Sequence, residues 1–178
     1  TKSEIDAEII DRAASLFAKH GFTHTSLQQI ADAVNYSKAG LLHHYPSKKA
    51  IYEAALRTGR EHMQSLHDSV QDTPIGIKRD RAVVEASVEY TFNWPGISAL
   101  VNQLADKEQE VDPEMAEMGS ILYSALGIDL DNLEQERIVR VTSAFMGLGI
   151  TALLAARLDL RREWRRHIVA AAMDALGH

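Results

Sequence analysis

The chain has 178 residues, of which 46% are hydrophobic, no cysteine, and a formal net charge of -6 at pH 7. This length can bury a core as one domain or as two small ones, and the absence of cysteine excludes disulfides, thiolate metal sites and thiol catalysis. No run approaches the roughly 18 apolar residues of a membrane helix, and the charged start TKSEIDAEII is unlike a signal peptide, so we expect a soluble, cytoplasmic protein with no membrane partner.

The charge is distributed unevenly along the chain. Residues 1–63 carry eight Lys or Arg and seven Asp or Glu, a net charge of +1, whereas residues 64–178 carry eleven and eighteen, a net charge of -7. Within the first part, residues 35–60 have a net charge of +4. An acidic body with a locally basic amino-terminal region keeps nucleic acid among the candidate partners.

Helical periodicity dominates the amino-terminal third. Apolar residues from Ile5 to Phe17 recur at steps of three and four, and Gly21 follows where a left-handed residue would end the helix. Thr25 and Gln28 then form a T-x-x-Q capping box. This box predicts the start of a second, short helix.

A sharp turn and another short helix are predicted next. Asn35 tolerates the left-handed conformation that such a turn requires, and Ser37 is a candidate N-cap for the third helix. Pro46 ends that helix, and Ser47 can cap a fourth one over about 47–70. Two short helices joined by about three residues indicate a helix-turn-helix, whose second helix enters a DNA major groove.

The remainder of the chain is predicted to be helical, with proline and glycine at its breaks. Pro74 and Gly76, the WPG of residues 94–96, Pro113 and the loop at 127–131 separate these helices. The last two are expected over about 132–158 and over RREWRRHIVAAAMDAL. No strand and no internal repeat is predicted, so the fold class is all-α.

Residues 4–60 resemble the DNA-binding domain of the tetracycline-repressor (TetR) family. The resemblance rests on AASLFAKHGFTHTSLQQIADAV, followed by SKAGLLHHYPSKKAIY. It implies a three-helix, helix-turn-helix DNA-binding domain at residues 1–48 and a helical effector-binding and dimerisation domain at residues 49–178, linked through the fourth helix. The implied function is a ligand-responsive transcriptional regulator, a repressor that a small-molecule effector releases from its operator.

The resemblance also implies which residues contact the duplex, a pseudo-palindromic operator. Phosphate contacts are implied for Thr25, Ser37 and Lys48. Leu42 stands where the family often has a tyrosine that bonds a phosphate, so we expect that contact to be absent. The other residues of the predicted DNA-binding face are Ser26, Gln28, Tyr36, Lys38, Ala39, Gly40, His43 and His44.

Large apolar side chains of the middle region could line a pocket for a small apolar or amphipathic effector. The same residues could equally fill the core of the domain. They are Tyr90, Phe92, Trp94, Met115, Met118, Tyr123 and Phe145.

Small residues form stripes on the last two helices, where they would allow close packing of helix backbones. A four-helix interface of a homodimer is one interpretation, and an ordinary intrachain core is the other. The stripe residues are Ala144, Leu148, Ala152, Ala156, Ala171 and Ala175.

The sequence contains no pattern that indicates catalysis, a cofactor or a metal. It has no G-x-S-x-G elbow, no P-loop and no H-E-x-x-H motif, and the adjacent His43 and His44 would diverge by about 100° on a helix. A ligand carrier without DNA binding and, less favoured, a small helical enzyme remain alternatives to the regulator.

Overall fold

The structure is a computed structural model that describes residues 2–105 and 113–178, and every regular element in these residues is an α-helix. The all-α prediction is therefore confirmed. In chain order the helices are α1 (Lys2–His20), α2 (Leu27–Ala33), α3 (Lys38–His44), α4 (Lys48–Val70), α5 (Ile77–Asn93), α6 (Pro95–Ala105), α7 (Pro113–Ala125), α8 (Gln135–Arg157) and α9 (Arg161–Leu176).

Local signals in the sequence set most of the amino-terminal helix ends. Gly21 is left-handed, with φ of 80°, and its N–H donates to the carbonyl of Phe17 at 2.8 Å. Asn35 has φ of 57°, as the predicted turn requires. Ser37 and Ser47 each cap the next helix by accepting a backbone N–H on the side-chain oxygen.

The capping box of α2 lies one residue later than predicted. The N–H of Ser26 donates to Gln29 Oε1 at 2.8 Å, and the N–H of Gln29 donates to Ser26 Oγ at 3.1 Å. The predicted pair of Thr25 and Gln28 is therefore wrong. The sequence offers both pairs, and burial of the Thr25 side chain selects the later register.

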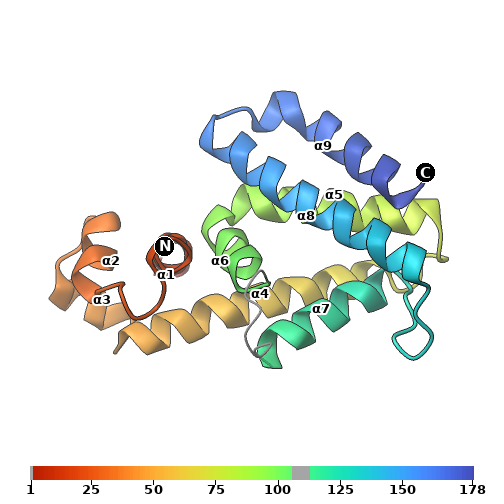
Figure 1. Cartoon of the computed structure of the whole chain (residues 1–178). Helices are drawn as coiled ribbons and strands as arrows, with labels where there is room; N and C mark the ends of the chain where they lie inside the picture. Colours follow the sequence, from red (N-terminus) through yellow and green to blue (C-terminus); the bar gives the residue numbers. More distant parts are fainter. Residues whose placement is uncertain (1, 106–112) are drawn as a thin grey trace.

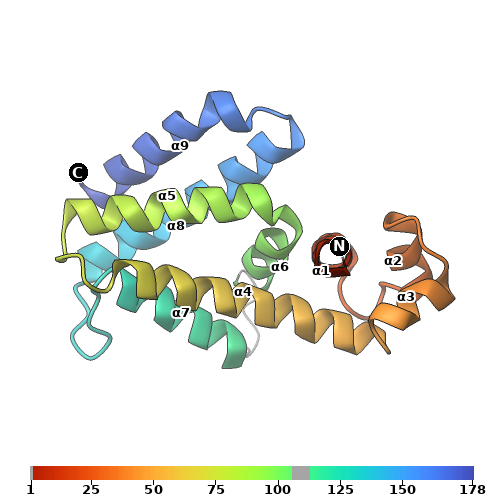
Figure 2. The ribbon, with the colours of Figure 1, turned by 180° about the vertical axis from the view of Figure 1, so that it is seen from behind.

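The helices form an elongated molecule with a small lobe at one end (Figure 1). Helices α1, α2 and α3 make this amino-terminal lobe, and α4 runs from it along the body, beside α7. Seen from behind, α6 lies between α1 and the rest of the body (Figure 2). Helix α4 is thus one continuous element that joins the lobe to the body.

Two hydrophobic clusters form the core. One is built from α5, α8 and α9 with the ends of α4 and α7. The other belongs to the lobe, but it also contains Ile51 of α4, Tyr90 of α5 and Ile97 of α6. The core around the helix-turn-helix therefore extends beyond residue 48.

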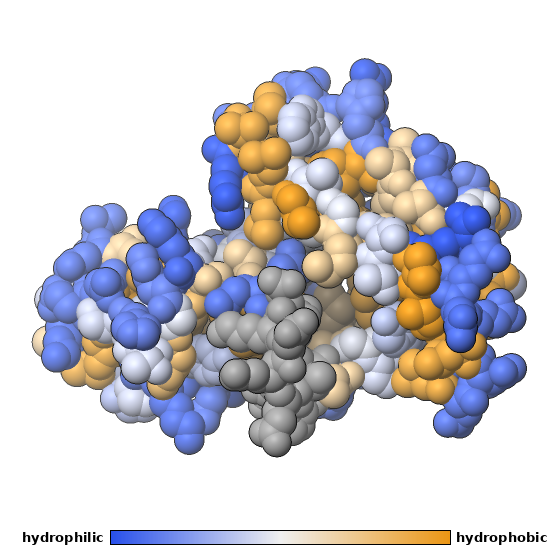
Figure 3. Space-filling view, viewed as in Figure 1, coloured by the Kyte–Doolittle hydropathy of each residue, from blue (hydrophilic) through white to orange (hydrophobic). Residues whose placement is uncertain are grey.

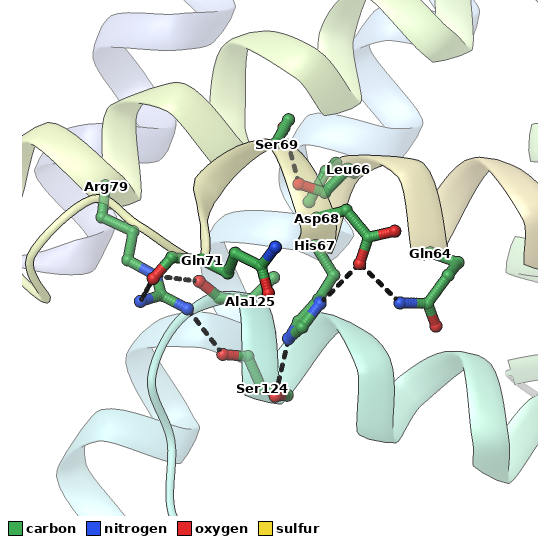
Figure 4. A network of polar contacts seen from close by, with 9 residues as sticks. All are labelled: Gln64, Leu66, His67, Asp68, Ser69, Gln71, Arg79, Ser124 and Ala125. Carbon is green, nitrogen blue, oxygen red and sulfur yellow. Dashed lines mark hydrogen bonds and ion pairs between the residues drawn. The ribbon is translucent and has the colours of Figure 1, made fainter.

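A buried arginine holds the far end of α4 in place (Figure 4). Arg79 is 8% exposed, and its guanidinium donates to the carbonyls of Ala125 at 2.6 Å and Ser124 at 3.2 Å, at the end of α7. It also reaches the carbonyls of Gln71 and Thr73, just beyond α4. Because the buried charge is surrounded by acceptors, α4, α5 and α7 are fixed together at this end.

Candidate DNA-binding face and effector cavity

Helix α3 presents one face to solvent. Lys38, Ala39 and His43 are exposed, as is the cap residue Ser37. The Ser37 Oγ accepts the N–H of Gly40 at 3.0 Å, so its own O–H stays available to a phosphate oxygen. Their contacts with DNA stay a prediction, and the exposure required for them is present.

Leu42 is 39% exposed on the same helix. An apolar side chain cannot donate a hydrogen bond to a phosphate, so the contact expected of a tyrosine at this position is absent from the predicted DNA-binding face. Gly40 is half-buried, and a Cβ there would lie 3.2 Å from Ser37 Oγ and from the Tyr36 ring. Its small size therefore serves the packing of the turn.

Thr25 lies inside the lobe. Its side chain is 1% exposed, and Oγ1 donates to the carbonyl of Gly21 at 2.8 Å, with Leu16 O at 3.3 Å. The hydroxyl closes the end of α1, and a phosphate contact through this side chain is not possible. Gln28 is exposed on α2, where Nε2 donates to Asp32 Oδ1 at 2.7 Å.

Lys48 fastens the loop between α1 and α2 to the start of α4. Its Nζ donates to the carbonyls of Phe22 at 2.6 Å and Thr25 at 2.8 Å, and lies 4.4 Å from the centroid of the Phe22 ring. Two of the three N–H groups of the ammonium are thus used within the lobe. A phosphate contact would have to use the third.

His44 connects α3 to α1. Its Nδ1 lies 2.7 Å from Asp6 Oδ1, and its ring meets the Tyr36 ring edge-on, with centroids 5.6 Å apart. The side chain is 15% exposed. The structure therefore gives His44 and Tyr36 a part in positioning α3, whereas the neighbouring His43 faces solvent.

A cavity of about 280 Å³ lies among α4, α5, α6, α7 and α8. Four of the predicted effector residues line it, namely Tyr90, Met118, Tyr123 and Phe145. Phe92 packs in the core of the body and Trp94 against the core of the lobe, so neither reaches the cavity. The side chain of Met115 lies outside the part of the chain that the structure describes.

The remaining wall includes small and hydroxyl-bearing residues, which were not among the large apolar residues predicted to line it. Ser87 and Thr91 stand four residues apart on α5, a spacing that places them on one face of the helix. Polar residues on an otherwise apolar helix face are the feature of the sequence that could have indicated this part of the cavity wall. The missed lining residues are Gly59, Met63, Ser87, Thr91, Ser98, Val101, Asn102, Gly119, Leu122, Val141, Thr142, Met146, Leu148 and Gly149.

A tight joint connects α1 to the start of α6. Asp11 Oδ1 accepts the N–H of Ile97 at 3.0 Å, and a Cβ at Gly96 would lie 1.8 Å from the Asp11 carbonyl oxygen. Burial raises the pKa of Asp11, and the bonds from Ile97 and Gly96 act against that rise. Because α6 also lines the cavity, this joint links the cavity wall to the lobe.

The predicted dimer stripe is divided between the core and the surface. Ala144, Leu148 and Ala152 are at most 5% exposed and pack in the core of the body, so for these three the intrachain interpretation is correct. Ala156 and Ala175 are half-buried and Ala171 is exposed. Their place in a dimer interface stays a prediction.

A different row of α8 is exposed and apolar. Val139, Met146, Ile150 and Leu154 are 40% to 64% exposed and recur at steps of four and seven, along one side of the helix. Hydrophobic side chains gather over α8 in the space-filling view (Figure 3). The helix is long and apolar enough to cross a membrane by length and composition alone, and only 33% of its most apolar stretch is buried within the chain.

Comparisons with known proteins agree with this geometry. The family described as "Bacterial regulatory proteins, tetR family" matches residues 9–55. The Staphylococcus aureus "Biofilm operon icaADBC HTH-type negative transcriptional regulator IcaR" is 39% identical over 59 residues, which are 33% of this chain and 32% of that protein. The "HTH-type transcriptional repressor KstR2" of Rhodococcus jostii is 31% identical over 110 residues, 62% of this chain and 52% of that protein.

The likeness in fold extends over nearly the whole chain. A crystal structure of a TetR-family transcriptional regulator from Bordetella parapertussis 12822 matches with a TM-score of 0.67 and 23% identity, over 96% of this chain and 94% of that one. The chain spans about a third of the length of IcaR and about half that of KstR2. Residues 9–55 thus match the TetR family of bacterial regulatory proteins, and nearly the whole chain has the fold of a solved member of that family.

Proposed function

We propose that the chain is a ligand-responsive transcriptional regulator that binds an operator as a homodimer in the cytoplasm and is released from it by a small molecule. The observation that carries this proposal is the course of α4. Lys48, in its first turn, holds the DNA-binding lobe together, and Gly59 and Met63, further along the same helix, line the cavity. A ligand in the cavity therefore touches the element that carries the lobe.

The DNA-binding part of the proposal rests on α3. Its exposed face carries Lys38, His43 and the N-cap residue Ser37. The first third of the chain is the less acidic part, with a net charge of +4 over residues 35–60. The similarity to IcaR, a negative transcriptional regulator, and to KstR2, a transcriptional repressor, favours repression as the outcome.

Release by a ligand needs one end of the body to stay fixed while the lobe moves. The Arg79 network fixes the far ends of α4 and α7, and His67 Nε2 adds a contact of 3.1 Å with Ser124 Oγ (Figure 4). The near end of α4 and the joint of Asp11 with Ile97 belong to the lobe. A coupling of about 1 to 3 kcal/mol between the sites changes affinity by about 5- to 150-fold.

The exposed row of α8 supports the homodimer. An apolar row of this length on a water-facing helix is stabilised when it is covered, and a two-fold axis covers it with its own copy. Two copies then present two α3 helices to the two halves of an operator. We therefore assign Val139, Met146, Ile150 and Leu154 to the interface, beside Ala156, Ala171 and Ala175.

The test is a mobility-shift titration of the full chain with the DNA that flanks its own gene, over a salt series and with nonspecific competitor. We expect retention at nanomolar protein that falls steeply as salt rises. Ile150→Glu, which places a charge in the exposed row, should give a monomer by light scattering and at least tenfold weaker retention. Gln135→Glu, at the start of α8, is the matched control for the added charge.

Weak binding that competitor abolishes at every salt concentration would contradict the operator-binding function. The alternative, a ligand carrier that does not bind DNA, would then be favoured by the apolar Leu42 on α3. A dimeric Ile150→Glu protein that binds DNA normally would instead refute the assigned interface and leave DNA binding intact.

A further inference from the structure

Two residues that line the effector cavity carry hydroxyl groups without a partner in the described part of the chain. Tyr90 and Ser98 are each 7% exposed, and within the described part of the chain neither hydroxyl oxygen has a hydrogen-bond partner. The neighbouring hydroxyls are satisfied, because Ser87 Oγ donates to Val83 O at 2.8 Å and Thr91 Oγ1 donates to Ser87 O at 3.0 Å. A buried hydroxyl without a partner costs about 1 to 3 kcal/mol. A ligand atom that bonds to either group, once the side chain has turned toward the cavity, would remove that cost.

The Tyr90 phenol and the His62 imidazole that packs on it are both uncharged. The His62 ring stacks on the Tyr90 ring, with centroids 3.5 Å apart and planes within 12°. Burial lowers the pKa of His62 to about 4, so the imidazole is neutral at physiological pH. Burial, and to a lesser extent the Asp11 carboxylate, raises the pKa of Tyr90, so the phenol keeps its proton.

The rest of the described wall would not compensate a charge on a ligand. It contains no Asp, Glu, Lys, Arg or His among the described residues that line the cavity. A carboxylate or phosphate placed there would lose its water without gaining a counter-charge, which costs several kcal/mol. Met63 and Met118 instead offer flexible apolar contacts that adapt to the shape of a hydrocarbon.

The size of the cavity indicates how much of a ligand it can bury. An apolar cavity of about 150 Å³ binds one benzene molecule, and this cavity measures about 280 Å³. It therefore fits a molecule of about two rings.

We propose that the cavity binds an uncharged, mostly apolar molecule of about two rings with one hydroxyl or carbonyl oxygen, and that the Tyr90 and Ser98 hydroxyls bind this oxygen. The inference rests on the proposed function for the role of the cavity and adds the chemical class of the effector. It excludes carboxylates and phosphates from the buried part of the ligand.

Three probes with one skeleton test the class, namely 2-naphthol, naphthalene and 2-naphthoate. Their affinity for the full chain is measured by calorimetry at pH 7, where the naphthol is neutral and the naphthoate is charged. We expect 2-naphthol to bind at least tenfold tighter than either of the other two. Equal or tighter binding of 2-naphthoate, or no binding of any probe, would overturn the proposal.

Variants of the two hydroxyls test the site. Tyr90→Phe and Ser98→Ala should each reduce the preference for 2-naphthol over naphthalene to about threefold or less, with the affinity for naphthalene unchanged. Ser87→Ala is the matched control, because this cavity-lining hydroxyl already bonds within α5. A preference that survives in both variants would show that another group binds the oxygen.

The two proposals fail separately, because these affinities are measured without DNA. Retention of operator DNA by a protein that binds none of the probes refutes the effector class and leaves the DNA-binding function standing. The expected probe pattern in a protein that does not retain DNA supports the effector class and refutes the regulator.

Discussion

The amino-terminal lobe and the effector cavity treat buried polar groups in opposite ways. In the lobe, Thr25 and Lys48 each bond to two backbone carbonyls. Among the cavity-lining residues, Tyr90 and Ser98 are each 7% exposed, yet their hydroxyls have no hydrogen-bond partner among the described residues. Satisfied groups hold a lobe in one geometry, whereas unsatisfied groups leave hydrogen-bonding capacity for a ligand.

The largest effect is expected at the joint between the two regions. Gly96→Ala places a Cβ 1.8 Å from the Asp11 carbonyl oxygen, so α1 must move away from α6 and the bond from Ile97 to Asp11 is strained. We expect a loss of about 3 kcal/mol in the free energy of unfolding, measured by urea denaturation.

Gly119→Ala provides the control for that change. A Cβ at Gly119 meets nothing within 4 Å, so replacement in the helix should stabilise the protein by about 0.5 to 1 kcal/mol. Equal effects of the two substitutions would mean that α1 and α6 are not held as tightly as the geometry indicates.

Removal of the lysine that fastens the lobe should have the next largest effect. Lys48→Ala deletes two charge-assisted hydrogen bonds, to Phe22 and Thr25, and should lower the free energy of unfolding by about 2 kcal/mol. In Lys49→Ala the lost group is 77% exposed and pairs with Glu53 on the same helix, so the change should stay within about 0.5 kcal/mol. If both variants were equally stable and only Lys48→Ala bound DNA more weakly, the main role of Lys48 would be to contact phosphate and not to stabilise the lobe.

Acid should weaken the cavity side of the molecule through His62. Its pKa in the folded protein, about 4, lies below the ordinary value of 6.5, so the unfolded chain binds more protons between these values and stability falls as pH decreases from 6.5 to 4. We expect wild type to lose about 1 to 2 kcal/mol relative to His62→Phe over this range, because partial solvent contact of the ring screens the cost.

The measurement is urea denaturation of both proteins at intervals between pH 4 and pH 7. The phenyl ring can keep the stack on Tyr90 without titrating, so it isolates the proton. Parallel curves for the two proteins would show that the imidazole reaches water when it is protonated.

The smallest effect has the most informative sign. Tyr90→Phe removes a buried hydroxyl without a partner and should raise the melting temperature of the unliganded protein, by the equivalent of about 0.5 to 1 kcal/mol. Thr25→Val removes a hydroxyl that bonds to the carbonyls of Gly21 and Leu16. It should lower the melting temperature, by the equivalent of about 1 to 2 kcal/mol in the free energy of unfolding. If both substitutions changed the melting temperature in the same direction, the buried hydroxyls of the lobe and of the cavity would not differ as the structure indicates.

Local chemistry made much of the lobe predictable. The left-handed Gly21 and Asn35 and the caps of Ser37 and Ser47 act within four residues of their own position, so the sequence alone indicates them. The capping box of α2 shows the limit of this reasoning. Two overlapping pairs satisfy the same pattern, and only the burial of Thr25 decides between them.

The cavity was only partly predictable, because large apolar residues serve a pocket and a core equally well. Phe92 and Phe145 look alike in the sequence, but Phe145 lines the cavity and Phe92 fills the core of the body. Ser98 gave no signal, since a serine within a helix ordinarily bonds back to its own backbone.

The sequence by itself determined the helices, their breaks and the family to which the first of them belong, because caps, turns and periodicity depend on neighbouring residues. Only the tertiary structure decided which face of α8 is buried, that Lys48 bonds across 26 residues to Phe22, and that Asp11 meets Ile97 across 86. The physical reason is that an amphipathic pattern specifies that a face must be covered, whereas the partner that covers it depends on how all the helices pack together.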